Sequence, residues 1–522
     1  MKNGSKGERG SNHLPLAIEL KNVSKSFGPV RANKDISLQI EKGTIHGIVG
    51  ENGAGKSTLV NILYGLHKAD SGSIHVDGEE AKIRSSADAI ALGIGMVHQH
   101  FMLVPNFTVL ENIILGSEGG ALLEGGKEQT LATLEELARE YGMHVDPHAL
   151  IEDLPVGIRQ RVEIIKAIKG GANILILDEP TGVLTPQEAD SLFAILNELK
   201  SRGVTILLIT HKLSEIMAVT DNVSIIRDGQ VVGHRKTGKT STGELAELMV
   251  GREVLLNVER GKPTPGEVRL SVNDLGCVSP IGVQQLQGMT FDVRGGEILG
   301  IAGVAGNGQT ELLELLSGMR EPETGKIEIL GSTITARHTK TPAAMREIGV
   351  GHIPEDRHHH GLVLDFEARE NFILGFHKSG QIGKGMFLNN AAIGAHCERL
   401  INEFDVRPPN PNLRATNFSG GNQQKIVIAR EMDQDPQVLI VGQPTRGVDI
   451  GAIEFIHKQL IAHRDRGCAI LLVSVELDEI LGLSDRIMVM NGGKQVGIID
   501  REQADERTLG LMMAGIAKDN AA

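Results

Sequence analysis

The chain has 522 residues, which is too many for one ordinary hydrophobic core and predicts at least two folded units. Its composition, 40% hydrophobic and 23% charged, is typical of a globular protein, and its net charge of −13 disfavours a nucleic-acid-binding surface, which would need clustered Lys and Arg. Three distant cysteines (Cys277, Cys397 and Cys468) lack metal-ligand spacing, so they predict neither a disulfide framework nor a zinc site and fit a reducing compartment.

The beginning of the chain predicts a flexible tail at 1–14, because it is polar and rich in Gly and Ser. It lacks the apolar run of a signal peptide. No later stretch approaches the roughly 20 apolar residues of a membrane span. We therefore expect any role at a membrane to come through a partner.

Eight residues, 50–57, satisfy the complete phosphate-loop pattern, between an apolar strand and a helical stretch. Glycines let backbone N–H groups turn toward phosphates at a helix N-terminus, Lys56 can reach the β and γ oxygens, and the Ser57 hydroxyl can ligate Mg²⁺. A plain Gly-rich turn is the alternative, and the full match disfavours it. The predicted ATP contacts here are Gly50, Glu51, Asn52, Gly53, Ala54, Gly55, Lys56, Ser57 and Thr58.

The apolar run at 174–177 predicts a buried strand that ends in Asp178 and Glu179. Carboxylates at the C-terminal edge of an α/β sheet lie where ligands bind. Asp178 is expected to hold the metal and Glu179 to polarise the attacking water as a general base. Beyond it, a helical stretch at 189–200 precedes a β-branched run at 205–210, and this alternation predicts a mainly parallel α/β sheet.

The chain is an internal duplication, because three segments recur in the same order in its second half. The recurring pairs are 45–63 with 298–316, 154–168 with 418–432, and 174–185 with 438–449. Between the copies, 259–267 is rich in Gly, Pro and charge, which is linker composition. The predicted divisions are a tail at 1–14, a first unit at 15–256, a linker at 257–267, a second unit at 268–515 and a tail at 516–522.

These motifs resemble the ATP-binding cassette family over nearly the whole chain. The resemblance implies two tandem cassettes, each with a mainly parallel sheet, an antiparallel β subdomain and a helical subdomain that carries the signature motif. It also implies that Phe27 stacks on adenine, that Gln99 joins the metal to the transporter-facing subdomain, and that His211 contacts the γ-phosphate. In this family two cassettes pack head to tail, so that each nucleotide lies between the phosphate loop of one and the signature of the other.

The two signature motifs depart from the family pattern in different ways. In the first half Pro155 stands where the family has a serine, and it has neither a hydroxyl nor a backbone donor. The second half keeps the residues expected to contact ATP held by the first half, namely Ser419, Gly420, Gly421, Asn422 and Gln423.

The second phosphate loop has Gln309 in place of the lysine, followed by Thr310. The missing charge removes an attraction on the order of several kcal/mol before desolvation. By the resemblance, Gly442 replaces the metal-binding aspartate, Gln443 the catalytic glutamate and Val475 the histidine, and Glu355 stands in for the glutamine. These losses and Pro155 belong to the same nucleotide site, because the damaged loop of the second half would face the damaged signature of the first. We therefore expect ATP to be hydrolysed only between Lys56 and Ser419.

Twin cassettes without membrane spans resemble the ATPases of bacterial sugar and nucleoside importers, and the segments from 96, 303 and 443 favour nucleosides. The implied cofactors are ATP and Mg²⁺. The implied partners are two transmembrane permease subunits and, indirectly, an extracytoplasmic solute-binding protein, with the chain peripheral at the cytoplasmic face of the inner membrane. A ribose- or galactose-type importer remains an alternative, as does a ribosome-associated twin-cassette ATPase, which the short linker disfavours.

Three consecutive histidines, 358–360, raise the possibility of a metal site. Adjacent histidines in a loop rarely converge on one ion without other ligands, so we favour a solvated segment that faces a partner. The stretch 357–364 follows Glu355 and is a candidate contact with the permease.

Overall fold

The computed structural model describes residues 14–28, 30–98, 101–115, 124–182, 184, 186–252, 260–304, 306–377, 380, 382–384, 387–448 and 450–515. The chain divides into two compact units, 1–254 and 255–522. The predicted tails lie almost wholly outside the described residues, as does the start of the predicted linker. In the described part, no helix has both the length and the apolar character needed to cross a membrane.

The first unit contains a four-stranded antiparallel sheet, in the order β2-β1-β4-β5, and a six-stranded sheet, in the order β10-β9-β3-β8-β7-β6. All strands of the second sheet are parallel except β10. The strands are β1 (Leu16–Phe27), β2 (Val30–Glu41), β3 (Ile45–Val49), β4 (Ser71–Val76), β5 (Glu79–Ala81), β6 (Ile94–Val97), β7 (Ile174–Asp178), β8 (Thr205–Ile209), β9 (Asn222–Arg227) and β10 (Gln230–Lys236).

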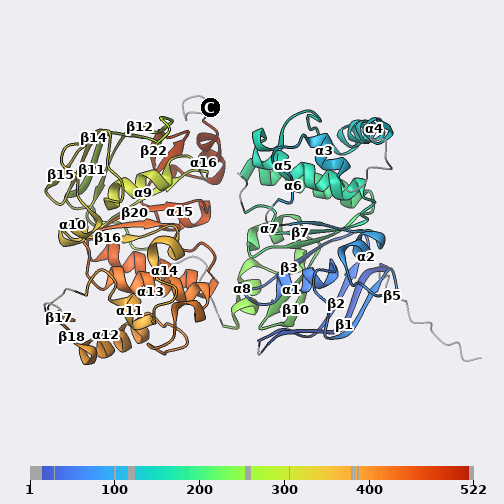
Figure 1. Ribbon diagram of the computed structural model, residues 1–522, viewed down its shortest axis with the longest axis horizontal. Coiled ribbons are helices and arrows are strands. Elements are labelled where there is room, and N and C mark those ends of the chain that lie inside the picture. Colours follow the sequence, from blue (N-terminus) through green and yellow to red (C-terminus); the bar gives the residue numbers. More distant parts are fainter. Residues whose placement is uncertain are drawn as a thin grey trace, which may run out of the picture. The chain divides into compact units, whose positions relative to one another are not determined.

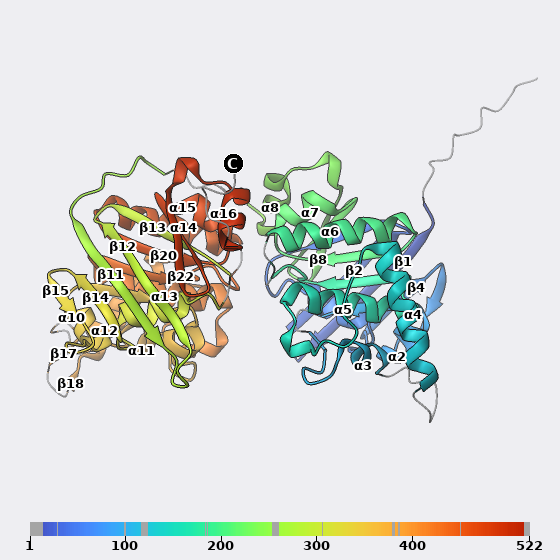
Figure 2. The ribbon, with the colours of Figure 1, turned by 90° about the horizontal axis from the view of Figure 1, so that it is seen from above.

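Figure 1 shows α3, α4 and α5 at one end of the first unit, opposite the antiparallel sheet. Seen from above, α6 lies along β8 (Figure 2). The helices are α1 (Lys56–Leu63), α2 (Ser86–Ala91), α3 (Val109–Ile114), α4 (Glu124–Tyr141), α5 (Val156–Lys169), α6 (Pro186–Ser201), α7 (Leu213–Val219) and α8 (Thr242–Val250).

Helix α1, which follows the phosphate loop, is held between the two sheets. Its residues Leu59 and Leu63 are fully buried and share one apolar cluster with Ile36 of the antiparallel sheet and Leu207 of the parallel one. Strand β3 is buried along its whole length, which explains its unbroken apolar run. The phosphate loop therefore joins two rigidly packed elements.

The second unit repeats this topology strand for strand. Its sheets have the orders β12-β11-β14-β15 and β16-β19-β20-β13-β21-β22, with a short β17-β18 pair in addition. The strands are β11 (Val268–Val278), β12 (Gln284–Arg294), β13 (Glu297–Ala302), β14 (Thr324–Ile329), β15 (Ser332–Ile334), β16 (Val350–Ile353), β17 (Gly383–Lys384), β18 (Phe387–Leu388), β19 (Val438–Gly442), β20 (Ala469–Ser474), β21 (Arg486–Asn491) and β22 (Lys494–Asp500). The predicted α/β fold class is confirmed in both units.

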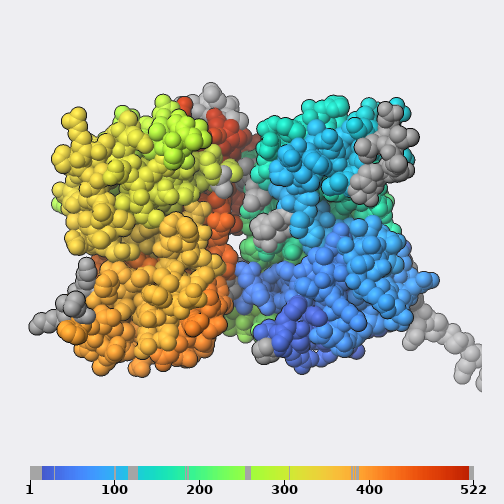
Figure 3. Space-filling model, in the orientation of Figure 1, coloured from blue at the N-terminus to red at the C-terminus, as the bar shows by residue number. Residues whose placement is uncertain are grey.

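The helices of the second unit are arranged around the same core, with α9 packed between its two sheets. The antiparallel sheet, coloured yellow-green to yellow, and the helical end, coloured orange, occupy opposite ends of the unit (Figure 3). The helices are α9 (Gln309–Ser317), α10 (Pro342–Glu347), α11 (Ala368–Phe372), α12 (Asn390–Glu403), α13 (Gly420–Met432), α14 (Ile450–Asp465), α15 (Leu477–Leu483) and α16 (Glu506–Met513).

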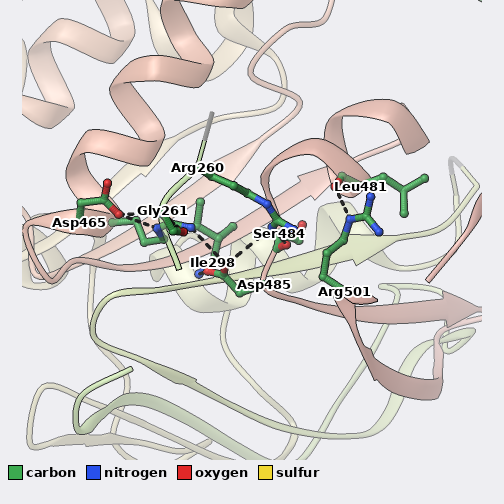
Figure 4. A network of polar contacts seen from close by, with 9 residues as sticks. Arg260, Gly261, Ile298, Asp465, Leu481, Ser484, Asp485 and Arg501 are labelled. Carbon is green, nitrogen blue, oxygen red and sulfur yellow. Dashed lines mark hydrogen bonds and ion pairs between the residues drawn. The ribbon is translucent and has the colours of Figure 1, made fainter. Parts of the chain in front are cut away.

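The segment that enters the second unit is anchored by a buried arginine, Arg464 of α14, which is 0% exposed. Its guanidinium bonds Asp485 at 3.1 Å and donates to the Gly261 carbonyl at 3.0 Å, and Arg260 also reaches Asp485 (Figure 4). The first unit has Lys200 with Asp221 at the equivalent place, and that pair is partly exposed. The planar guanidinium adds donors that an ammonium lacks, so it also holds the incoming main chain.

Candidate functional site

The first phosphate loop holds its lysine inside the loop. Lys56 is 5% exposed, and its ammonium donates to the carbonyls of Gly50 at 2.7 Å and Glu51 at 3.0 Å. Burial lowers the pKa of Lys56, and the carboxylates of Glu179 and Asp178 partly offset this effect. A phosphate would compensate the desolvated charge, so the loop suits an anionic ligand.

Two glycines are required by the path of the loop. Gly55 caps α1 with φ at +100°, a conformation that L side chains rarely adopt. A Cβ at Gly50 would lie 2.2 Å from the Ile226 carbonyl oxygen, so no side chain fits there. Ser57 and Thr58 follow in the first turn of α1, where Ser57 is exposed at the mouth of the loop.

The predicted acid pair ends strand β7. Glu179 has φ at +48°, and its backbone N–H donates to the Ile209 carbonyl at 2.8 Å. Its carboxylate lies 3.0 Å from Nδ1 of His211, so the structure brings these two predicted residues together. The hydrogen bond from His211 is the main reason why the pKa of Glu179 is lowered. Glu179 is therefore ionised at neutral pH, as a general base must be.

The pKa of Asp178 is shifted in the opposite direction from that of Glu179. Burial, together with the neighbouring Glu179 charge, raises its pKa to about 6, while Lys56 lowers it. A divalent cation would offset the repulsion between the two carboxylates, and oxygen donors such as Asp178 and Ser57 are the ligands Mg²⁺ prefers. These residues fit the metal that the family implies.

Of two further predicted residues, the structure describes Phe27 but not Gln99. Phe27 ends β1 with its ring 45% exposed and in edge-to-face contact with His67, so it offers a surface to a flat ligand. In the second unit the corresponding connection, 279–283, has no aromatic residue, a difference readable in the sequence that the motif comparison missed. Gln99 lies outside the described residues.

Sequence reasoning also missed Glu163 of α5, which is 7% exposed. One of its carboxylate oxygens accepts the Met102 N–H. Among the described residues, its second oxygen has no hydrogen-bond partner. Burial raises the pKa of Glu163 to about 7. This carboxyl thus contacts the segment that follows 99–100. The repeat offered a signal, because the second copy has Val427 at this position.

We expect Glu163→Gln to alter how stability depends on pH. Because the folded pKa is raised, the unfolded chain ionises first between about pH 4.5 and 7, so the carboxyl makes the free energy of unfolding fall as the pH rises through that window. Glutamine cannot ionise, so the free energy of unfolding of the variant, relative to that of the wild type, should rise by about 2 kcal/mol between pH 5 and 8.

Thermal unfolding of the full chain at several pH values measures this difference. Glu136→Gln, on the exposed face of α4, is the matched control and should follow the wild type. An identical pH dependence in Glu163→Gln and wild type would contradict the assignment.

In the second unit, each replaced group bonds to the protein itself. Gln309 is 4% exposed, and its amide donates to the Gly303 carbonyl at 3.1 Å, as Lys56 does to Gly50. The Thr310 hydroxyl donates to the Glu355 carboxylate at 2.8 Å. The loop keeps its shape but lacks the charge of the lysine, and the Glu355 carboxylate faces its hydroxyl.

The position of the metal-binding aspartate is filled in the second unit. A Cβ at Gly442 would lie 2.7 Å from Cδ1 of Leu313 and 2.9 Å from the backbone nitrogen of Glu355. Gln443 keeps the unusual backbone of Glu179, with φ at +46°, but its side-chain oxygen accepts the Val475 N–H at 3.2 Å. The missing acid is therefore a change of packing as well as of chemistry.

The two signature segments also differ in structure. Ser419 caps α13: its hydroxyl accepts the backbone N–H of Asn422 at 3.5 Å and the Asn422 side-chain amide at 2.8 Å. Pro155 occupies the same position before α5 and makes no side-chain cap. Gly420 and Gly421 form the first turn of α13.

The histidine run is a π-helical turn, η3 (Arg357–Gly361), and the expectation of a loop was wrong. The Asp356 carboxylate accepts the backbone N–H groups of His358 and His359, which closes the turn. His358 also bonds Gln423, so part of the run faces the signature helix. In the described part of the chain, no group of three or more His, Cys, Asp or Glu side chains is placed to hold a metal.

Comparison with known proteins decides the family. The model of the ABC transporter family matches residues 33–182 and again 286–446. The chain belongs to the ABC transporter family. Both units are thus ATP-binding cassettes, and the resemblance inferred from the motifs is confirmed.

Similar proteins span almost the whole chain. The nucleoside import ATP-binding protein of Lactococcus lactis is 47% identical, with 95% of this chain and 98% of that protein covered. The guanosine import ATP-binding protein of Bacillus subtilis is 45% identical, covering 97% and 99%. The ribose import ATP-binding protein of Chromobacterium violaceum is 38% identical, covering 95% and 97%. As a member of this family, the ABC chain is an ATPase coupled to transport.

Proposed function

We propose that this chain powers a nucleoside importer and turns over one ATP site, between the phosphate loop of the first cassette and the signature of the second. The contrast between the two acid positions carries the proposal. Glu179 is ionised and bonded to His211, whereas Gln443 cannot take a proton and is bonded to main chain. At this position the first cassette has a base for the attacking water and the second does not.

In this proposal the nucleotide and metal ligands are divided between the cassettes. Lys56 and the backbone of 50–58 would hold the phosphates, Ser57, Asp178 and Gln99 the Mg²⁺, and Phe27 the adenine. Bound Mg²⁺ supplies charge neutralisation for the transferring phosphoryl group. Residues 419–423 of the second cassette would close over the γ-phosphate.

The solute is assigned through the relatives. The two more similar of the three relatives described above are import proteins for nucleosides and guanosine, at 47% and 45% identity, while the ribose protein is 38% identical. A glucose import protein of Haloferax volcanii, at 42%, keeps a sugar as the alternative. Uptake of labelled guanosine and ribose by cells with and without the chain would separate the two.

Import ATP-binding proteins work with membrane permease components. We propose two permease subunits for this chain, a solute-binding protein outside the membrane and a peripheral position at the cytoplasmic face of the inner membrane. The net charge of −13 argues against nucleic acid as a partner.

Turnover in the permease-bound complex tests the single-site proposal. Lys56→Ala and Ser419→Ala should each reduce ATP hydrolysis by about 100-fold or more, because each removes one half of the same site. Gln309→Ala, at the lysine position of the second cassette, is the matched control and should stay within about twofold of wild type. Persistent turnover in either of the first two variants would show that the second site works.

A further inference from the structure

The connection between β16 and α11 in the second cassette is longer than its counterpart in the first. Asn112 and Asn371 are equivalent, because each side-chain amide bonds the main chain of the residue eight positions earlier. Asn112 lies 15 residues after the end of β6 at Val97, and Asn371 lies 18 after the end of β16 at Ile353. The three extra residues fall in the stretch that forms η3, next to the intact signature.

The first side chains of η3 turn toward the signature helix. Nη1 of Arg357 donates to the carbonyl of Arg446 at 2.7 Å, in the turn after Gln443. Nε2 of His358 donates to the Gln423 side-chain oxygen at 2.8 Å. The extra residues therefore connect the segment after Glu355, the signature helix and the turn at 446–447.

Arg357 occupies the space where a side chain at position 420 would be. An ideal Cβ on Gly420 would lie 2.7 Å from Nη2 of Arg357 and 2.9 Å from the Gly447 carbonyl oxygen. The first cassette has Val156 at this signature position, and no arginine follows its glutamine segment at 100–103. Glycine at position 420 therefore leaves room for the guanidinium of Arg357.

The charge of Arg357 is placed where an anion would be favourable. Its guanidinium lies beside the N-terminus of α13, the positive end of a 13-residue helix. Its Nε is buried and has no partner among the described residues. Burial lowers the pKa of Arg357, and the Asp356 carboxylate only partly offsets this. A polyphosphate at the helix N-terminus would relieve this concentration of positive charge.

We propose that Arg357 is a positioning residue for ATP hydrolysis. It holds the first turn of α13 against the turn at 446–447, so that Ser419 and the backbone N–H groups of Gly420 and Gly421 are presented to the γ-phosphate. The inference rests on the proposed function, in which this signature completes the productive site. Arg357 lies in the connection that is three residues longer in the second cassette than in the first.

Steady-state hydrolysis by the full chain in complex with its permease tests the role. Arg357→Ala should lower kcat about tenfold, because the signature is misplaced, and Arg357→Lys should recover part of the loss. ATP affinity of the isolated full chain, measured with a fluorescent ATP analogue, should be unchanged in both. Arg407→Ala is the matched control, because its exposed side chain pairs with Asp405 and the substitution keeps its backbone N–H, which donates to Asn422.

A double substitution separates positioning from general damage. Gly420→Ala should impair the wild type but cost less in the Arg357→Ala background, because the guanidinium no longer fills the space. If Ser419→Ala abolishes turnover while Arg357→Ala keeps the wild-type kcat, or if the two substitutions at 357 and 420 act independently, the role of Arg357 is refuted. If Ser419→Ala itself keeps turnover, the single-site proposal fails instead.

Discussion

Replacement of Glu179 by glutamine is expected to reduce ATP hydrolysis by the assembled importer by about 100-fold or more, with ATP binding retained. The Glu179 carboxylate accepts a hydrogen bond from His211 at 3.0 Å, which keeps it ionised and oriented. An amide of the same size can fill the space but cannot take a proton from water. Turnover and nucleotide occupancy, measured in the same permease-bound sample, separate the chemical step from binding.

Gln443→Glu is the matched control, because it introduces the acid at the equivalent position of the second cassette. It should not raise turnover, since the side chain there bonds the Val475 N–H, and Val475 stands where the first cassette has His211. A Glu179→Gln protein that hydrolyses ATP within about threefold of the wild type would remove Glu179 from the role of general base.

Gly442→Asp is expected to destabilise the second cassette and not to create a metal site. Its Cβ would lie 2.9 Å from the Glu355 nitrogen and 2.7 Å from Leu313 Cδ1, so the backbone after β16 would have to move. The new carboxylate would also be buried next to the backbone of Glu355. Overpacking and burial of a charge together cost about 3 kcal/mol.

Thermal unfolding of the full chain measures this cost, and Mn²⁺ binding in the presence of nucleotide reports a metal site. Gln443→Glu, which buries a carboxylate at the neighbouring position without added volume, should lower the unfolding temperature less than Gly442→Asp, because it does not also overpack the site. An unchanged unfolding temperature for Gly442→Asp, together with a gain in Mn²⁺ binding, would show that the degenerate site lacks only its acid.

Much of the site is local in the sequence and was predictable for that reason. A phosphate loop needs consecutive residues between a strand and a helix, which is where Lys56 lies. Asp178 is likewise marked by its place at the end of a buried strand. The duplication further allowed each motif to be compared with its copy, which exposed Gln309 and Gly442. Alternating strand and helix patterns predicted the parallel sheets on the same basis.

Other features depend on contacts between residues distant in the chain. Glu163 meets Met102 from another element, and Arg357 fills the space beneath Gly420. No spacing rule encodes such pairs, because they arise when separate helices and connections pack together.

The sequence by itself determined the two cassettes, their order and which catalytic groups each possesses, because those properties belong to consecutive residues. Only the tertiary structure decided that the place of the second metal-binding aspartate is occupied by the Glu355 backbone, and that Arg464 holds the entering main chain. A missing side chain can be read from one position, but the atoms that take its space come from elsewhere in the fold.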